Sequence, residues 1–193
     1  MRQLPSRHAT LQHGFTLIEL LITISILGVL MAVALPNLRS FVVSNRLSSD
    51  VNNFIGFINY ARSEAIVRNQ SVLICPKNNA SNACVATQFW AEYDIEMFVD
   101  VDGNNAWSTG DILLKTMPAI DTSTTQTSFN KQSATGYIKF GAVGMSQTIN
   151  RFDMFAVGSA AYNAQYGRTI CISKPGRARV VALMTTTSPC SAF

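Results

Sequence analysis

Four cysteines, a group of aspartates and a cluster of basic residues are the side chains whose types and spacing could do chemistry in this sequence. The two histidines, His8 and His13, both precede a long apolar run, so cleavage there would leave a chain without histidine. Ser-His-Asp triads, Cys-His nucleophiles and histidine-containing zinc sites each need an imidazole. We therefore expect a protein that is not an enzyme.

The cysteines are at positions 75, 84, 171 and 190. A zinc site with four thiolates favours closely spaced C-x2-C pairs, which this sequence lacks. Disulfides form in exported proteins, and the apolar run near the N-terminus of this chain indicates export. Of the three possible pairings, we expect Cys75–Cys84 and Cys171–Cys190, because each closes a local loop, with a chain-entropy gain of about 2–3 kcal/mol.

The aspartates lie in the segment Asp100-Val101-Asp102-Gly103-Asn104-Asn105 and at Asp111. Oxygen ligands at alternating positions around a glycine are typical of calcium loops, but the terminal glutamate of an EF-hand is missing. Asp-Gly and Asn between two strands are also what an ordinary turn requires. We expect the turn, with no metal and no cofactor, and keep calcium binding as the alternative.

Charge is distributed unevenly along the chain. Residues 85–125 contain seven acidic and one basic residue, whereas residues 126–193 contain one acidic and seven basic residues. Such an asymmetry marks an anionic partner such as nucleic acid, or two sides of a subunit interface, although surface charge without a partner can have the same layout.

The basic end contains the segment Lys174-Pro175-Gly176-Arg177-Ala178-Arg179. Pro175 and Gly176 suit the central positions of a type II turn. Alternate residues of a strand share a face, so Arg177 and Arg179 should point the same way about 6–7 Å apart, which is comparable to successive phosphates of a nucleic-acid strand. The expected polyanion-binding set is Arg177, Arg179, Gly176, Lys174 and Arg168, with Lys139 as a further nearby cation.

The elements that position these groups begin with an apolar run. Residues 15–35 contain one ionisable side chain, Glu19, and match the roughly 20 residues of a membrane-spanning helix. Arg2 and Arg7 precede the run, which places everything after Pro36 on the far side of the membrane. An ordinary signal peptide cleaved after Ala34 is the alternative, but its apolar core should be shorter and carry no acid.

The segment Gly14-Phe15-Thr16-Leu17-Ile18-Glu19-Leu20 resembles the prepilin signature of type IV pilins and type II secretion pseudopilins. The resemblance implies that prepilin peptidase cleaves after Gly14, that Phe15 becomes the N-methylated terminus and that Glu19 pairs with a neighbouring pilin subunit. It divides the chain into a leader (1–14), a transmembrane and assembly helix (15–36) and a periplasmic globular domain (37–193). It also implies a single-pass inner-membrane protein that assembles into a surface pilus or a periplasmic pseudopilus.

Apolar residues continue at helical spacing beyond the membrane segment, at Leu47, Val51, Phe54, Ile58, Ala61 and Ala65. We expect one helix from about residue 15 to 69, whose apolar stripe packs on a sheet. Beyond it, strands are predicted at 72–75, 89–101, 112–117, 137–140, 152–157, 169–173 and 180–184, and a polar loop or short hairpin at 121–135. The predicted fold class is α+β, with a long N-terminal stem helix on an antiparallel sheet.

Two further segments narrow the resemblance to the GspH/FimT branch of minor pilins and pseudopilins. The first is residues 61–69 with the following Val72–Cys75, although Arg62, Glu64 and Arg68 alone fit a solvated helix face. The second is Gly176-Arg177-Ala178-Arg179, which resembles the G-R-x-R motif of FimT-type pilins and implies DNA binding in natural transformation. The alternatives are a FimU-like adaptor between the tip complex and the major fibre, or a GspH-like secretion pseudopilin.

Overall fold

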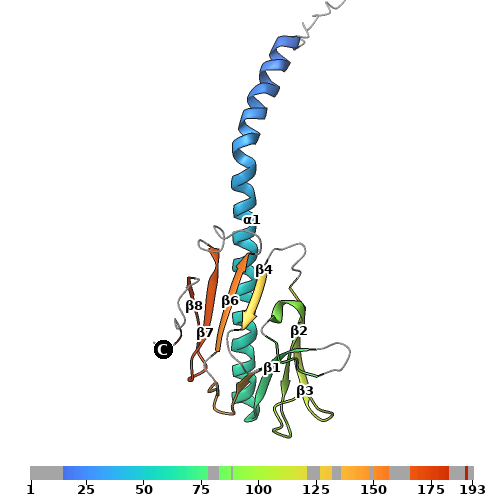
Figure 1. The fold of residues 1–193 in the computed structure, drawn as a ribbon, viewed down its shortest axis with the longest axis vertical. Coiled ribbons are helices and arrows are strands. Elements are labelled where there is room, and N and C mark those ends of the chain that lie inside the picture. The colour runs from blue at the N-terminus through green and yellow to red at the C-terminus, as the bar shows by residue number, and fades with distance from the viewer. Residues whose placement is uncertain are drawn as a thin grey trace, which may run out of the picture. The chain divides into compact units, whose positions relative to one another are not determined.

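The computed structural model describes residues 15–77, 83–87, 89–120, 127–131, 136–147, 150–156, 166–182 and 190 (Figure 1). Its first element is helix α1, Leu17–Arg68. The chain divides into two compact units, which meet between Arg39 and Ser40 within this helix. Each unit is described below by itself.

Both ends of α1 have capping interactions that the sequence explains. The Glu19 N–H donates to the Thr16 hydroxyl at 3.3 Å, as in the first half of a T-x-x-E capping box. At the other end Asn69 adopts φ 53°, the left-handed conformation that asparagine tolerates. The N–H groups of Asn69 and Gln70 then donate to the carbonyls of Ile66 and Ala65, at 3.3 and 3.2 Å, and end the helix.

In the first unit, α1 is apolar on every side. The window Leu17–Ala34 has a mean hydropathy of 2.5 and none of it is buried, so this is one helix long and apolar enough to cross a membrane. Thr23 and Ser25 bond their hydroxyls to the carbonyls of Leu20 and Leu21, which leaves few polar groups on the surface.

In the second unit, α1 packs through the stripe that its periodicity predicts. Leu47, Val51, Phe54, Ile58, Ala61 and Ala65 are each at most 4% exposed, and Phe57 joins them. The remaining core comes mainly from the strands that follow the helix, with Trp90 and Ala91 between them. Figure 1 shows these strands beside α1.

These strands form two antiparallel sheets of four strands each, rather than the single sheet expected from the sequence. Sheet A has the order β3-β2-β1-β5 and sheet B the order β4-β6-β7-β8. Sheet A contains β1 (Val72–Lys77), β2 (Asp94–Val99), β3 (Ile112–Met117) and β5 (Ile138–Phe140), and sheet B contains β4 (Thr127–Lys131), β6 (Asn150–Ala156), β7 (Arg168–Ile172) and β8 (Ala178–Ala182).

Two details of the strand prediction were wrong. Strand β4 lies inside 121–135, where a loop or a local hairpin was expected, and pairs with the distant β6. The segment predicted as one strand from 89 to 101 begins with a short 3-10 helix, η1 (Trp90–Glu92), before β2. The reason is packing, because Trp90 is fully buried and its ring contacts Phe152 edge-on, 5.2 Å between centroids.

One core joins α1 to both sheets and confirms the α+β fold class. It includes Phe54 from α1, Ile74 and Met97 from sheet A, and Phe152 and Ile170 from sheet B. In sheet B, β6 and β7 have one face against this core and the other face turned away from it. That second face carries the basic residues considered next.

Candidate functional site

The hairpin of β7 and β8 presents the basic segment. Its turn is closed by a hydrogen bond from the Gly176 N–H to the Ser173 carbonyl at 2.8 Å, which makes Lys174 and Pro175 the two central residues. The expected type II turn, centred on Pro175 and Gly176, was therefore one residue out of place. Gly176 follows the turn with φ +78°, a left-handed conformation that suits glycine in hairpin connections.

Gly176 is buried, and its lack of a side chain is a packing requirement. A Cβ atom there would lie 2.2 Å from the Gly144 carbonyl oxygen, closer than real contacts allow. The same oxygen accepts a hydrogen bond from Arg62 Nε at 3.0 Å. The turn is further tied to this region by the Ser146 N–H, which donates to the Lys174 carbonyl at 2.9 Å.

Arg62 therefore has a structural role, whereas the sequence pattern placed it on a solvated helix face. It is half-buried and links α1 to the loop that supports the Gly176 turn. Glu64 and Arg68, in contrast, form the expected i,i+4 ion pair at 2.6 Å on the helix surface. The Arg68 guanidinium, as the largest influence, lowers the pKa of Glu64.

Arg177 and Arg179 are both exposed and lie on one face of sheet B. Arg179 is directly opposite Cys171 in the register of β7 and β8. The pairing continues to Arg177, whose carbonyl accepts the Ser173 N–H at 3.0 Å. Because opposite residues share a face and positions alternate along a strand, both arginines lie on the face turned away from the core residues Ile170 and Ile172.

Neighbouring residues on this face bind the acidic side chain that lies there, Asp153. Asp153 lies 3.0 Å from Arg151 Nε and accepts the Thr169 hydroxyl at 2.6 Å. It is also the one acidic residue between positions 126 and 193. Arg177 and Arg179 therefore add positive charge to a face on which Asp153, the acidic side chain among its described residues, already has a cation beside it.

The other members of the expected set are placed differently. Lys174 is exposed at the tip of the turn, near Arg177 in the chain. Arg168 is half-buried at the start of β7, where its Nη1 donates to the carbonyls of Tyr166 and Gly167, each at 3.0 Å. Lys139 belongs to sheet A, is 7% exposed and contacts Asp100 at 3.1 Å, so it does not extend the basic surface.

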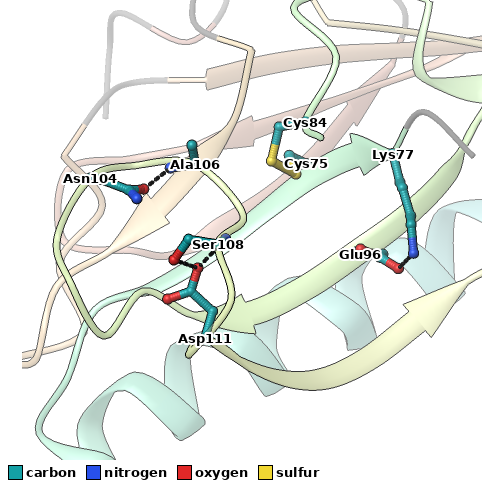
Figure 2. Close-up of a disulfide and its surroundings, with 8 residues drawn as sticks. All are labelled: Cys75, Lys77, Cys84, Glu96, Asn104, Ala106, Ser108 and Asp111. Carbon is teal, nitrogen blue, oxygen red and sulfur yellow. Dashed lines mark hydrogen bonds and ion pairs between the residues drawn. A yellow bond between two sulfur atoms is a disulfide. The ribbon is translucent and has the colours of Figure 1, made fainter. Parts of the chain in front are cut away.

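Both expected disulfides are present. Cys75 and Cys84 have Cα atoms 5.5 Å apart, and Cys171 and Cys190 have theirs 5.4 Å apart. Figure 2 shows the first bond next to the loop that contains Ser108 and Asp111, and the Lys77–Glu96 ion pair of 2.6 Å on the same sheet. The second bond joins position 190 to Cys171 in β7, the hairpin residue directly opposite Arg179.

The aspartates of the predicted turn come together. One carboxylate oxygen each from Asp100, Asp102 and Asp111 lies within 4.8 Å of the other two. The pKa of Asp102 is lowered, mainly because its carboxylate accepts a hydrogen bond from the Asn104 N–H.

A cavity of about 390 Å³ lies between α1 and the end of β3, away from the basic hairpin, and was not predicted. Asp50 is its acidic member, half-buried, with Oδ2 lacking a hydrogen-bond partner among the described residues. Burial raises the pKa of Asp50, and Arg46 opposes part of that rise. The lining is otherwise mainly apolar: Asn53, Phe54, Phe57, Lys115, Thr116, Met117, Pro118, Ala119, Ile120 and Met154.

At the N-terminus, Gly14 lies outside the described residues. Phe15 is 85% exposed, and Glu19 is exposed in the first turn of α1. An acid at this position interacts favourably with the positive end of the helix dipole. The T-x-x-E spacing that caps the helix could have been recognised in the sequence.

Two family models match the sequence. The model described as type II transport protein GspH matches residues 50–176, and the prokaryotic N-terminal methylation motif matches residues 10–35. The first match spans the sheets up to the turn of the β7–β8 hairpin, and the second contains the start of α1.

Three solved structures are similar. Two are crystal forms of the type IV minor pilin FimU of Pseudomonas aeruginosa PAO1, both 20% identical, with TM-scores of 0.51 and 0.50. They cover 77% and 69% of this chain, and 96% and 91% of their own chains. The third is the minor pseudopilin EpsH from the type 2 secretion system of Vibrio cholerae, with 10% identity, a TM-score of 0.46 and coverage of 70% and 95%.

Proposed function

The GspH family model matches well over half of this chain, so the chain belongs to the GspH family, and within that family we propose a specific role. The protein is a minor pilin that binds the phosphate backbone of DNA through its β7–β8 hairpin. The role of a type IV minor pilin or pseudopilin follows from the family and the fold together. Members of this class are structural subunits rather than enzymes.

The assembly part of the proposal concerns the N-terminus. Prepilin peptidase cleaves after Gly14, Phe15 becomes the methylated terminus, and Glu19 pairs with a neighbouring subunit once the leader 1–14 is removed. Support comes from the methylation-motif match over residues 10–35 and from the unburied apolar window Leu17–Ala34. Residues 15–36 then hold the chain in the inner membrane, with 37–193 in the periplasm, before it joins other pilins in a fibre.

One observation carries the DNA-binding part: Arg177 and Arg179 are exposed on the same face of sheet B. Two guanidiniums at this spacing suit two phosphates along a backbone. Lys174 adds a third charge at the turn. Contacts to phosphate position a protein without reading bases, so binding should be independent of sequence and suited to uptake of DNA in natural transformation.

Two residues of the expected set have supporting roles in this proposal. Gly176 allows the turn to dock against Gly144 and contributes no contact of its own, because it is buried. Arg168 holds the backbone at the start of β7 and is left out of the proposed phosphate contacts.

A second candidate function is that of a FimU-like adaptor that connects the tip complex to the major fibre, or of a pseudopilin in a secretion system. The similarity in fold to FimU supports it, as does the separation of charge, since acidic residues lie on β2 and in the β2–β3 loop and basic ones on β7, β8 and their turn. Such faces suit contacts between successive subunits.

The experiment compares full-length proteins in detergent, with DNA affinity measured by fluorescence anisotropy over a range of salt concentrations. The double variant Arg177→Gln, Arg179→Gln should bind more weakly and flatten the slope of log affinity against log salt by roughly 1.8 units, at about 0.9 per phosphate contact. Its stability should change by less than about 0.5 kcal/mol, because the substituted residues are exposed.

The matched control is Arg68→Gln, Lys115→Gln, which removes two exposed cations elsewhere. It should leave the slope unchanged, which separates specific contacts from an effect of net charge. An unchanged slope in the arginine double variant would exclude these residues as contacts. Absence of DNA binding in the natural protein, together with failure of the double variant to assemble, would favour the adaptor.

A further inference from the structure

The loop 100–111, which connects β2 to β3, gathers three carboxylates at one point. Oxygens of Asp100, Asp102 and Asp111 lie within 4.8 Å of one another. The loop begins at the buried end of β2 and folds back, so that its first and last aspartates meet. An ordinary turn needs one such side chain, and three in contact repel one another unless positive charge lies between them.

Backbone donors hold all three carboxylates in place, and Asp100 Oδ2 accepts the Asn105 N–H at 3.3 Å. The N–H groups of Val101 and Ser108 donate to the two oxygens of Asp111, at 2.9 and 2.8 Å. The Asn104 N–H donates to Asp102 Oδ1 at 3.1 Å, and Gly103 between them has φ +74°. The loop therefore has a defined conformation that keeps Asp102 and Asp111 close together.

Among the described residues, one carboxylate oxygen of the cluster lacks a donor. The Ser108 hydroxyl lies 3.0 Å from Asp102 Oδ2 and 3.1 Å from Asp111 Oδ2. These two oxygens also accept the Asn104 side-chain amide at 2.7 Å and the Ser108 N–H at 2.8 Å. Asp100 has a side chain that is 0% exposed, and its Oδ1 has no hydrogen-bond partner among the described residues. A buried carboxylate oxygen without a donor is costly, and it points to a ligand that is not a protein group.

The net charge of the cluster also points to a ligand that is not a protein group. Lys139 Nζ contacts Asp100 Oδ2 at 3.1 Å and also bonds to the Asn105 side chain, so it is committed to one side of the cluster. One lysine against three carboxylates leaves an excess of two negative charges. The oxygen of Asp100 that faces no donor is the one that Lys139 does not contact.

We propose that this loop binds a calcium ion through the carboxylates of Asp100, Asp102 and Asp111 and the hydroxyl of Ser108. Calcium binds oxygen ligands at 2.3–2.6 Å, so two ligands of one ion lie at most about 5 Å apart, and the three carboxylate oxygens, all within 4.8 Å of one another, satisfy this limit. A divalent ion cancels the excess charge. Magnesium fits less well, because it requires shorter bonds and regular octahedral geometry. The site does not depend on DNA binding.

The test uses the full-length protein in detergent, stripped with EGTA and titrated with CaCl2 in a calorimeter. We expect saturable binding with a dissociation constant of about 0.1–1 mM, the range of extracellular calcium modules. Trp107 lies in the loop, with its ring 5.2 Å from that of Phe98, and its fluorescence should follow the same titration. Calcium should raise the melting temperature by several degrees, and MgCl2 at equal concentration should raise it less.

Asp102→Asn should weaken calcium binding at least tenfold and remove the calcium-dependent rise in melting temperature. Because Asp102 is exposed, the variant should melt in EGTA near the natural protein. Ser108→Ala should weaken binding less. The matched control is Glu92→Gln, an exposed acid in η1, which should bind calcium normally.

Absence of calcium binding to the natural protein would overturn the proposal, and this measurement does not depend on any variant being folded. Equal affinity for magnesium would overturn the choice of calcium. Equal losses in Asp102→Asn and Glu92→Gln would show that calcium is held by surface charge in general rather than by this loop.

Discussion

Gly176 is fixed by its surroundings rather than by the partner proposed for the neighbouring arginines. Its φ of +78° and the Gly144 oxygen, 2.2 Å from where a Cβ would lie, each penalise any other residue. Gly176→Ala should therefore lower the free energy of unfolding by at least about 2 kcal/mol, measured by denaturant unfolding of the full-length protein.

The matched control is Gly56→Ala. Gly56 lies in the interior of α1, and an added Cβ would meet nothing within 4 Å, so this change should raise the free energy of unfolding by about 0.5–1 kcal/mol. The two variants should therefore change the free energy of unfolding in opposite directions. If Gly176→Ala were as well tolerated as Gly56→Ala, the close approach to Gly144 would not be a constraint in the folded protein.

At single residues, the sequence predicted the chemistry better than the contacts. The pairing of the cysteines and the common face of Arg177 and Arg179 follow from loop length and strand alternation, both of which are local. Arg62 was misjudged because its partner, Gly144, is 82 residues away in the chain. Arg168 and Lys139 were placed with the arginines on charge alone, although the fold gives each a different partner.

Among the elements, α1 was the easiest to predict, because its apolar stripe repeats at helical spacing and each predicted stripe residue is buried. The division of the strands between two sheets was not visible in the sequence. β5 pairs with β1 in sheet A, although β4 before it and β6 after it both belong to sheet B. Local pattern shows that a segment is a strand but does not identify its neighbour.

The pH dependence of the melting temperature should report on the burial of Asp50 on α1. Burial raises its pKa in the folded protein, so the folded state holds this proton more firmly than the unfolded chain does. Ionisation therefore penalises folding as the pH rises above about 4, the ordinary pKa of an aspartate. Asp50→Asn should raise the melting temperature at pH 7 and leave it little changed near pH 3.5.

Glu64→Gln provides a control of opposite sign. The Arg68 guanidinium lowers the pKa of Glu64, so its ionised form stabilises the fold above its ordinary pKa, and that contribution is lost as the pH falls. This variant should melt slightly lower at pH 7 and unchanged at pH 3.5. If Asp50→Asn also lost stability at pH 7, the carboxylate would be favourable where it lies, contrary to its raised pKa.

At the scale of the whole molecule, the charge asymmetry of the sequence corresponds to its division into sheets. The acidic segment 85–125 forms β2, β3 and the aspartate loop of sheet A. The basic segment 126–193 supplies all four strands of sheet B. Composition indicated that charge is divided along the chain, whereas the fold shows that the acidic segment joins sheet A and that the basic segment forms sheet B and adds β5 to sheet A.

Processing at the N-terminus is the prediction that concerns the entire chain. Mass spectrometry of the mature protein should find a chain that begins at methylated Phe15, and Gly14→Ala should leave the longer precursor in the membrane. Glu19→Ala should still insert, since loss of an acid makes the segment more apolar, but should assemble poorly. A mature chain that begins at Leu35 would indicate an ordinary signal peptide instead.

The Cys171–Cys190 bond closes a covalent ring that contains the Gly176 turn, both exposed arginines and all of β8. Trypsin-like proteases cut after arginine, so an exposed hairpin of this kind is open to attack outside the cell. A single cut after Arg177 or Arg179 opens the ring but releases no fragment, because the Cys171–Cys190 disulfide still joins the two pieces. The nicked protein gains only the mass of one water and keeps its basic strand until a reductant separates the pieces.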